Sequence, residues 1–462
     1  MKVGVITLGC DKNTVDSERY IAELGDYQGE LTTDLDDADV IIVNTCGFID
    51  AAKRESIDAI VSASSHKQTG RCQAVVAVGC MVERHRQELA AELPEVDLFL
   101  GASDANRLVP ELIERGLLSA DVEVLHPGVR VYAGDLPHVR YLKISEGCDH
   151  GCAFCAIPLM RGKHRSFALG DVIREAQLLE MQGARELNLV AQDLAHYGRD
   201  VGDGNGLPQL LKALIAETDI PWLRMLYLYS AGITDELLEV VANEPRVLRY
   251  LDMPMQHAAD AVLARMRRPE RKKTIRKKVS RFRAAVPDVA IRTTCIVGFP
   301  GETDEHFEEL AEFLEEMQFE RVGVFTYSPQ EGTRAALLAD DVPETIKRER
   351  LERLTELQRG ITAARYEQRV GKTAIAIVDR VDSENDISIA RLPWQADDID
   401  GVTFIDEALA PGTLAEVAVR EVVDDYDFAA SLIRIHSKPV VKKIVRERSL
   451  PLHTASVGSY GR

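Results

Sequence analysis

Six short apolar segments alternate with longer helical ones between about residues 138 and 365. Because parallel strands need helical crossovers, this alternation predicts a (β/α) domain that forms an open or complete barrel. In such barrels the reactive residues lie at the carboxyl ends of the strands. The predicted strands are 141–145, 186–190, 222–227, 250–253, 290–297 and 321–326.

A smaller alternation of the same kind precedes this region and predicts a parallel α/β domain over residues 1–118. Its predicted strands are 3–8, 40–43, 74–78 and 96–100, and its clearest helices are 16–24 and 83–93. Residues 119–137 contain two prolines and two glycines and are predicted to be a linker.

The chain changes character after a long charged helix predicted over residues 344–369. Short runs rich in Val, Ile and Thr follow, separated by Pro, Gly and Asp, and predict strands at residues 373–378, 387–390, 401–405 and 414–423. This pattern is typical of a small all-β barrel, predicted here over residues 368–437. The (β/α) core before it is predicted over residues 138–365, and residues 438–462 are predicted to be a basic tail. The predicted fold class is therefore α/β with a small all-β domain at the carboxyl end.

Charge and cysteine content limit the classes of function. The 462 residues carry a net charge of −19, which argues against a general nucleic-acid binder and suits a basic macromolecular partner. No stretch approaches the ~20 apolar residues that span a bilayer, and the first residues do not form a signal peptide. We therefore expect a cytosolic protein with no membrane attachment. In that reducing compartment the eight cysteines do not form a disulfide framework, and their spacing favours metal ligation.

Three cysteines directly after predicted strand 141–145 have the spacing C-x3-C-x2-C: Cys148, Cys152 and Cys155. Three thiolates can hold three irons of a [4Fe–4S] cluster and leave the fourth iron without a protein ligand. Such an open iron can chelate the amino and carboxylate groups of a small molecule. The alternative is a structural zinc site with a ligand from elsewhere, although zinc motifs usually come as pairs of C-x2-C.

Three further cysteines, Cys10, Cys46 and Cys80, are far apart in sequence, but each follows a predicted strand. Because the carboxyl ends of parallel strands share one edge, the three sulfurs could converge there. Each has a glycine beside it, which would let the backbone approach a bulky inorganic group. Taken alone, scattered cysteines are more often buried small apolar residues. Beside the first motif, a second cluster site is the better interpretation.

Together with Phe154 before its last cysteine, the first motif resembles the radical SAM superfamily, in which a reduced cluster cleaves S-adenosylmethionine (SAM) to a 5′-deoxyadenosyl radical. Residues 1–118 resemble the N-terminal domain of the methylthiotransferases within that superfamily, and the resemblance extends over about residues 1–437. The segments that carry it are Gly9-Cys10-Asp11-Lys12-Asn13, Asn44-Thr45-Cys46-Gly47-Phe48-Ile49 and Gly79-Cys80-Met81.

This resemblance implies two [4Fe–4S] clusters. The catalytic cluster would bind Cys148, Cys152 and Cys155, and an auxiliary cluster on the other three cysteines would hold the sulfur to be transferred. It also implies two SAM molecules per turnover, one as methyl donor and one as radical source, together with an electron donor and a sulfur source. Both sites must then face one chamber, so the edge of the N-terminal sheet should face the mouth of the barrel.

Positions that match SAM-binding segments of the superfamily lie in or directly after two of the barrel strands. Basic residues after the cluster loop, among them Arg161 and Arg165, could contact SAM or the carboxylate of a substrate, or form a solvated basic surface. Glu302 could instead cap the helix that follows it. The predicted SAM contacts are Glu186, Gln192, Thr294, Gly298 and Glu302.

The substrate class is suggested by the C-terminal barrel, which resembles an RNA-binding TRAM domain. Methylthiotransferases mainly modify either tRNA (MiaB type) or an aspartate of ribosomal protein S-twelve (RimO type). The segment 253–258, with parts of the N-terminal domain, resembles the RimO type. Residues 371–437 contain fourteen Asp and Glu against five Lys and Arg, a net charge of −9. This charge repels tRNA and attracts a basic ribosomal protein.

The sequence therefore predicts methylthiolation of the aspartate β-carbon in ribosomal protein S-twelve, with the acidic barrel docking that protein. A tRNA adenosine methylthiotransferase and a non-catalytic iron–sulfur protein with a redox or RNA-binding role are the alternatives.

Overall fold

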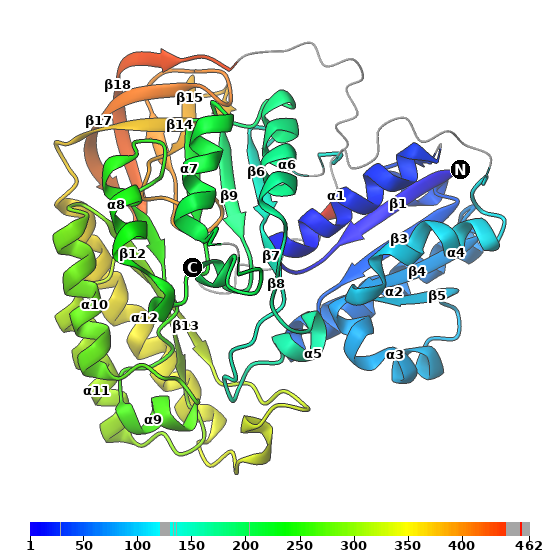
Figure 1. Ribbon diagram of the computed structural model, residues 1–462, viewed down its shortest axis with the longest axis horizontal. Coiled ribbons are helices and arrows are strands. Elements are labelled where there is room, and N and C mark those ends of the chain that lie inside the picture. Colours follow the sequence, from blue (N-terminus) through cyan, green and yellow to red (C-terminus); the bar gives the residue numbers. More distant parts are fainter. Residues whose placement is uncertain are drawn as a thin grey trace.

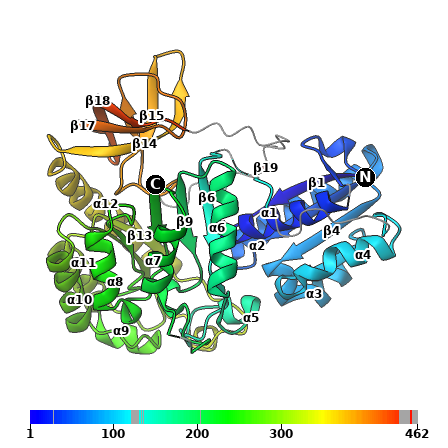
Figure 2. The same ribbon diagram turned by 45° about the horizontal axis from the view of Figure 1, so that its top comes forward.

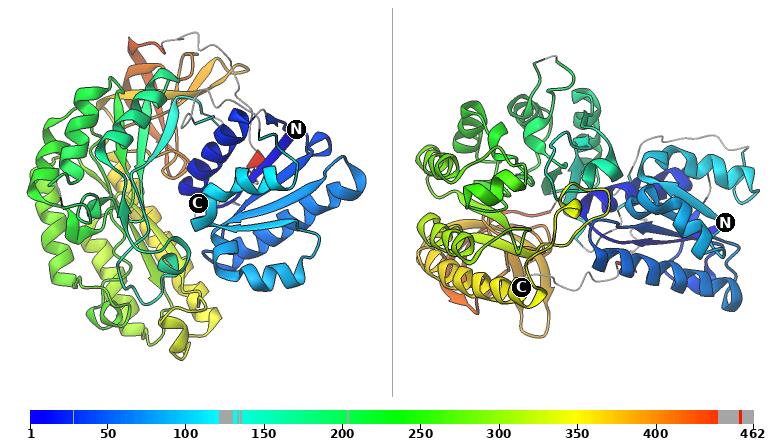
Figure 3. Two further views of the ribbon diagram at one scale, coloured as in Figure 1. Left: turned by 45° about the vertical axis from the view of Figure 1, so that its right-hand side comes forward. Right: turned by 90° about the horizontal axis from the view of Figure 1, so that it is seen from below.

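The computed structural model describes residues 1–27, 29–120, 130–132, 134, 136–202, 204–439 and 453–454. These residues form three parts: an N-terminal α/β sheet, a central (β/α) partial barrel and a C-terminal β-barrel (Figure 1). The three parts remain distinct in views from other directions (Figures 2 and 3). Within the described ranges, no helix is both long and apolar enough to cross a membrane.

The N-terminal part is a parallel sheet covered by helices. Its elements are β1 (Lys2–Thr7), α1 (Asp11–Asp26), β2 (Glu30–Leu31), β3 (Val40–Thr45), α2 (Asp50–Thr69), β4 (Ala74–Gly79), α3 (Cys80–Glu92), β5 (Leu98–Gly101), α4 (Leu108–Glu114) and β19 (His453–Thr454). The strand order is β19-β1-β3-β4-β5, with β2 also paired to β1. Every residue of β3 and β4 is buried, because α1 and α4 cover one face of the sheet and α2 and α3 the other.

The central part contains six parallel strands in two sheets of three. They are β6 (Val139–Lys143), β9 (Glu186–Val190), β10 (Trp222–Met225), β11 (Tyr250–Asp252), β12 (Ala290–Val297) and β13 (Arg321–Thr326). The sheets have the orders β6-β9-β10 and β11-β12-β13 and adjoin between β10 and β11. This arrangement is the predicted (β/α) partial barrel, in which β6 and β13 are the outer strands.

The barrel strands alternate between an outer helical layer and the barrel interior. The covering helices are α6 (Leu169–Met181), α7 (Leu207–Glu217), α8 (Asp235–Asn243), α9 (Asp260–Arg265), α10 (Lys272–Ala285), α11 (Asp304–Met317) and α12 (Glu344–Glu367). In β9, Leu187 and Leu189 pack into the helical layer. Because successive side chains of a strand point to opposite faces, Glu186 and Asn188 face the interior.

The C-terminal part is a closed barrel with the strand order β14-β15-β16-β18-β17. Its strands are β14 (Thr373–Asp382), β15 (Ile387–Arg391), β16 (Thr403–Ile405), β17 (Leu414–Val423) and β18 (Asp427–Ser437). The all-β prediction is confirmed, but β18 is not among the predicted strands. Its second half is exposed and mixes Arg434 and His436 with isoleucines, so it lacks the apolar run that marked the other strands.

The C-terminal barrel closes the amino end of the partial barrel. At the start of β11, Tyr250 donates a hydrogen bond to Asp400 (Oη–Oδ2 2.6 Å), and beside β6, His138 Nε2 lies 2.9 Å from Asp379 Oδ1. Trp222, the first residue of β10, packs in an apolar cluster shared with the C-terminal barrel. The carboxyl ends of the strands therefore point away from the C-terminal barrel.

Two predicted segments lie largely outside the described residues. Of the linker 119–137, the structure describes residues 119–120, 130–132, 134 and 136–137. Of the tail 438–462, it describes residues 438–439 and β19, whose backbone pairs in parallel with Ile6 and Thr7 of β1.

Candidate active site

Three cysteines of the N-terminal domain meet at the carboxyl edge of its sheet. Cys10 follows β1 and precedes α1, Cys46 follows β3, and Cys80 follows β4 as the first residue of α3. A β-carbon added at Gly9 would lie 3.0 Å from the Cys46 sulfur, so the first two segments are in contact. Burial raises the pKa of the Cys80 thiol to about 12, and the nearby Cys10 and Cys46 add to this shift.

Glycines and an asparagine make this convergence possible. Gly79 has φ +101°, and a β-carbon there would lie 2.5 Å from Asn44 Oδ1. Gly47 packs against the start of α3 so closely that an added β-carbon would lie 2.8 Å from Met81 Cα. The Asn13 side chain donates to the carbonyl oxygens that precede Gly9 and Cys46, at 2.7 and 3.2 Å. The three strand ends therefore form one connected site.

The C-x3-C-x2-C cysteines lie on a loop that two short strands close at its base. These strands, β7 (Ser145–Glu146) and β8 (Arg165–Ser166), pair antiparallel. Gly147 has φ +81°, and a β-carbon there would lie 2.1 Å from the carbonyl oxygen of Lys163, so only glycine fits. Across the barrel mouth, the Ala153 N–H donates to the Met266 carbonyl at 2.9 Å. The loop is therefore held on two sides.

The thiols on this loop are partly buried and close to one another. Burial raises the pKa of Cys148 to about 11 and that of Cys155 to about 12, and Cys152 adds to both shifts. Arg268 Nη1 lies 3.7 Å from Cys152 Sγ. Thiols with such pKa values keep their protons in the metal-free protein and release them when a metal binds.

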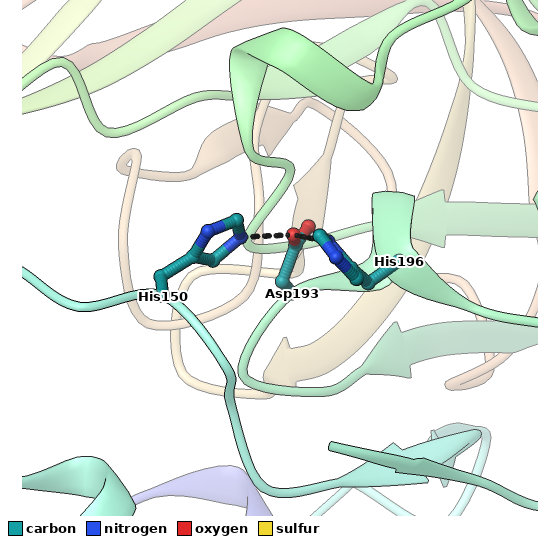
Figure 4. A group of neighbouring side chains, drawn as sticks. All are labelled: His150, Asp193 and His196. Carbon is teal, nitrogen blue, oxygen red and sulfur yellow. Dashed lines mark hydrogen bonds and ion pairs between the residues drawn. The ribbon is translucent and has the colours of Figure 1, made fainter. Parts of the chain in front are cut away.

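A histidine within the cluster loop is fixed by a carboxylate that follows β9. His150 Nε2 and His196 Nδ1 lie 2.8 and 2.9 Å from Asp193 Oδ2 (Figure 4). Asp193 Oδ1 accepts backbone N–H groups from Ala195 and Tyr229 at 2.9 and 3.1 Å. Burial alone would raise the pKa of Asp193, but the hydrogen bonds from the two histidines hold it well below its usual range.

The ligand atoms of His150, Asp193 and His196 lie within 4.8 Å of one another, a grouping whose chemistry could also hold a metal ion. In this structure one nitrogen of each histidine is hydrogen-bonded to Asp193 Oδ2. With four hydrogen bonds to the carboxylate, the group is a hydrogen-bonded anchor of the cluster loop.

A short helix connects the two cysteine sites. This helix, α5 (Ile157–Arg161), begins two residues after Cys155 and packs against Cys80 of the other site. Near the same boundary, Lys12 Nζ lies 3.5 Å from the centre of the Tyr227 ring, which follows β10. The edge of the N-terminal sheet therefore faces the carboxyl ends of the barrel strands, as the sequence predicted.

Two of the predicted SAM contacts have their carboxylates engaged in buried ion pairs. Glu186 lies at the amino end of β9, between Arg224 Nε and Arg391 Nη2, each at 2.7 Å. It is therefore at the end of the barrel opposite the cysteine sites. Glu302 pairs with Arg350 (Oε1–Nη1 2.9 Å), and the following residue, Thr303, caps α11.

The other three positions lie nearer the carboxyl ends of the strands. Gln192 follows β9 and donates to Glu146 beside the cluster loop (Nε2–Oε1 2.6 Å). Thr294 is half-buried and alternates with core residues of β12, so it faces the interior. Gly298 has φ +71°, and a β-carbon there would lie 2.3 Å from the side chain of Lys347. Gln192 and Thr294 remain candidates to contact SAM.

An ionic network between the two cysteine sites was not predicted. Lys143 pairs with Asp16 of α1 and with Glu146 of the cluster loop, the latter at 2.6 Å. Arg161 Nη1 joins the network 2.7 Å from Asp16 Oδ2. The available signal was a lysine inside an apolar strand, because a buried charge requires a partner. The sequence alone could not name that partner.

The two sets of cysteines fit iron–sulfur clusters. Each offers three sulfur donors, as many as a [4Fe–4S] cluster with one open iron requires. The glycines beside them let the surrounding segments pack closely, since an added β-carbon would meet Cys46 at Gly9, Asn44 at Gly79 and Lys163 at Gly147. A zinc site would need a fourth ligand in the same place.

Comparison with known proteins agrees with this geometry. A model described as "Radical SAM superfamily" matches residues 142–314, and one described as "Uncharacterized protein family UPF0004" matches residues 2–101. Among solved structures, the radical S-adenosylmethionine methyltransferase TsrM from Kitasatospora setae has a TM-score of 0.56 at 12% identity. That similarity covers 78% of this chain and 89% of TsrM, and it concerns the fold alone.

Fold and site together define a radical SAM enzyme, a class that uses a [4Fe–4S] cluster and SAM. Curated relatives named "Ribosomal protein uS12 methylthiotransferase RimO" are more specific. The one from an Anaeromyxobacter species is 44% identical over 94% of this chain and 93% of its own length, and that from Geobacter sulfurreducens is 41% identical over 94% and 98%. The chain belongs to the RimO family of methylthiotransferases, for which homology also supports a second cluster.

Proposed function

We propose that this chain transfers a methylthio group to the β-carbon of an aspartate in ribosomal protein uS12. The observation that carries the proposal is the pair of three-cysteine sites joined by α5. The chain's curated relatives are named as methylthiotransferases of ribosomal protein uS12. One cluster with an open iron suffices to cleave SAM. A second such cluster fits a reaction in which sulfur must also be delivered.

In this proposal the three parts divide the work. Residues 1–118 hold the auxiliary cluster on Cys10, Cys46 and Cys80. Residues 138–365 hold SAM and the catalytic cluster, and residues 368–437 bind the substrate protein. An electron donor and a sulfur source act as further partners.

The reaction needs radical chemistry because the β-carbon of an aspartate has an unactivated C–H bond that no side-chain base could deprotonate usefully. When bound, the cluster on the C-x3-C-x2-C loop supplies the electron for reductive cleavage of SAM. The chain's own residues fix the geometry. In this proposal His150 and Asp193 orient the loop, Gln192 and Thr294 contact SAM, and α5 sets the separation of the two sites.

Docking of a basic protein by the C-terminal barrel depends on the charges that remain at its surface. Some acidic residues are buried in internal pairs, such as Asp379 with Arg391 and Asp400 with Arg321. The exposed acidic residues are Glu384, Asp386, Asp398, Asp406, Glu407, Glu421 and Asp424, and the exposed basic ones are Lys372, Arg380, Arg420 and Arg434. The surface therefore stays acidic, which favours uS12 over tRNA and mainly accelerates encounter.

The deciding experiment compares substrates in a strain that lacks this gene. Mass spectrometry of uS12 and of tRNA nucleosides should show loss of the modification from uS12 alone, restored by the intact gene. Complementation with Cys46→Ala, which removes one auxiliary ligand, should not restore it. Loss of a tRNA modification would assign the MiaB-type alternative, and no loss from either substrate would contradict the proposal.

A further inference from the structure

Arg161 is a buried cation that crosses from the radical SAM domain to the auxiliary site. It is the last residue of α5, six residues after Cys155, and its side chain is only 5% exposed. This burial excludes the solvated basic surface that its sequence context allowed.

All three nitrogens of the guanidinium contact the N-terminal domain. Nε lies 3.1 Å from Cys80 Sγ, Nη2 lies 2.6 Å from Asn13 Oδ1, and Nη1 lies 2.7 Å from Asp16 Oδ2. Asn13 also links the Cys10 and Cys46 segments through its amide. The planar guanidinium is therefore fixed in orientation, with its Nε–H directed at the sulfur. These contacts direct Arg161 toward the auxiliary site.

The charges around Arg161 indicate that its Nε–H stabilises negative charge on the Cys80 sulfur. Arg161 and Lys143 face two carboxylates, Asp16 and Glu146, so this buried network is neutral without the cysteine. Three thiolates on a cluster would add negative charge beside it. A fixed N–H donor stabilises that charge in a site from which water is largely excluded. Hydrogen bonds to the sulfurs are among the factors that set the reduction potential of an iron–sulfur cluster.

We propose that Arg161 is a positioning residue of the auxiliary site, whose Nε–H···S hydrogen bond to Cys80 raises the reduction potential of the cluster held there. The inference rests on the proposed auxiliary cluster. It gives α5 a second role, because one short helix follows the ligands of the catalytic cluster and ends at a donor to the other cluster. The hydrogen bond would favour the reduced form, since reduction adds negative charge to the sulfurs.

The test uses the full chain carrying Cys152→Ala, so that only the auxiliary site can hold a complete cluster. After anaerobic reconstitution, iron content and a dithionite titration followed by electron paramagnetic resonance are compared with and without Arg161→Gln. We expect about four irons per chain in both proteins and a more negative midpoint potential for Arg161→Gln. The control Arg174→Gln removes an exposed arginine of α6 and should leave the potential unchanged.

An unchanged potential with retained iron would overturn the role of Arg161. Should Arg161→Gln lose its iron, a second measurement tests the hydrogen bond directly. It is pulsed electron paramagnetic resonance of the reduced Cys152→Ala protein labelled with guanidino-¹⁵N arginine. A ¹⁵N coupling to the cluster that Arg161→Lys abolishes supports the hydrogen bond, and its absence overturns it. A Cys152→Ala protein that binds no iron would refute the auxiliary cluster itself and this inference with it. The proposed function is tested independently, by measuring uS12 modification in the deletion strain.

Discussion

Arg391 of the C-terminal barrel lies 2.7 Å from Glu186 at the start of β9, and neither side chain is more than 1% exposed. Glu186 also pairs with Arg224, and Arg391 also pairs with Asp379. One buried network of alternating charges thus joins the (β/α) partial barrel to the C-terminal barrel.

Removing Arg391 should therefore destabilise the protein. Arg391→Ala leaves Asp379 without its arginine and Glu186 with one partner in a buried site. Breaking a buried pair in this way typically costs about 3–5 kcal/mol. The midpoint of urea unfolding should fall accordingly. Arg420→Ala breaks an exposed pair with Asp406 and should cost less than about 1 kcal/mol; equal losses in the two variants would contradict the structural role of the network.

The same network predicts that Asp397 makes the stability of the folded protein depend on pH in an unusual direction. Burial and the neighbouring Asp398 and Asp379 raise the pKa of this carboxyl to about 7. Its pKa in the unfolded chain is about 3.9, so the folded protein binds more protons between pH 4 and 7. The contribution of Asp397 to stability is therefore present at low pH and is lost as pH rises through 7.

Asp397→Asn should remove this loss. The variant should match the unaltered protein near pH 4 and exceed its stability by roughly 1–3 kcal/mol at pH 8. Thermal unfolding at both pH values measures the difference. Asp386→Asn, at an exposed position on the same barrel, should show no such dependence, and a less stable Asp397→Asn at pH 8 would refute the raised pKa.

The division of labour between the two cysteine sites predicts separable losses of function. Cys152→Ala should abolish release of 5′-deoxyadenosine from SAM under anaerobic reducing conditions. Cys46→Ala should leave that release intact and stop transfer of the methylthio group. Chromatography of the nucleoside and mass spectrometry of uS12 report the two steps. If Cys46→Ala lost both, the sites would not act separately.

Asp193→Asn tests the anchor of the cluster loop. An amide cannot accept hydrogen bonds from both histidines and two backbone N–H groups as the carboxylate does, so His150 should lose its fixed position. Substitutions of groups that orient metal ligands typically cost 10–100-fold in activity or affinity. We expect SAM cleavage to fall by about tenfold with the iron content largely retained. Asp171→Asn, at an exposed position of α6, is the control, and an unchanged cleavage rate in Asp193→Asn would remove the anchor from the mechanism.

Much of the fold could be predicted because its signals are local. The runs that became β9, β12, β13 and β17 have the predicted limits, since each is a short, mostly apolar or β-branched segment between turns. Helix α1 begins at Asp11, whereas the sequence predicted a start at residue 16. The prediction missed the first turn because Asp11, Lys12 and Asn13 show no apolar periodicity. Those residues serve the cysteine site, so their pattern reflects function more than packing.

The candidate site could be predicted only in part for a similar reason. The cysteines are marked by spacing and by neighbouring glycines, which are local features. The partners of Glu186 and Arg161 are not marked by any local feature. Arg391 follows Glu186 by more than two hundred residues, and Asp16 precedes Arg161 by more than one hundred. A carboxylate that resembles a SAM contact in sequence can thus be a domain-joining charge, and only the three-dimensional arrangement separates the two roles.

The position of the C-terminal barrel also limits the geometry of any protein that reacts here. Since it seals the amino end of the partial barrel through contacts such as Tyr250 with Asp400, a polypeptide cannot be drawn through the enzyme from one side to the other. The target must enter and withdraw by the same opening. The modified aspartate is therefore expected at the tip of a protruding hairpin or loop, a position that a folded substrate could also present.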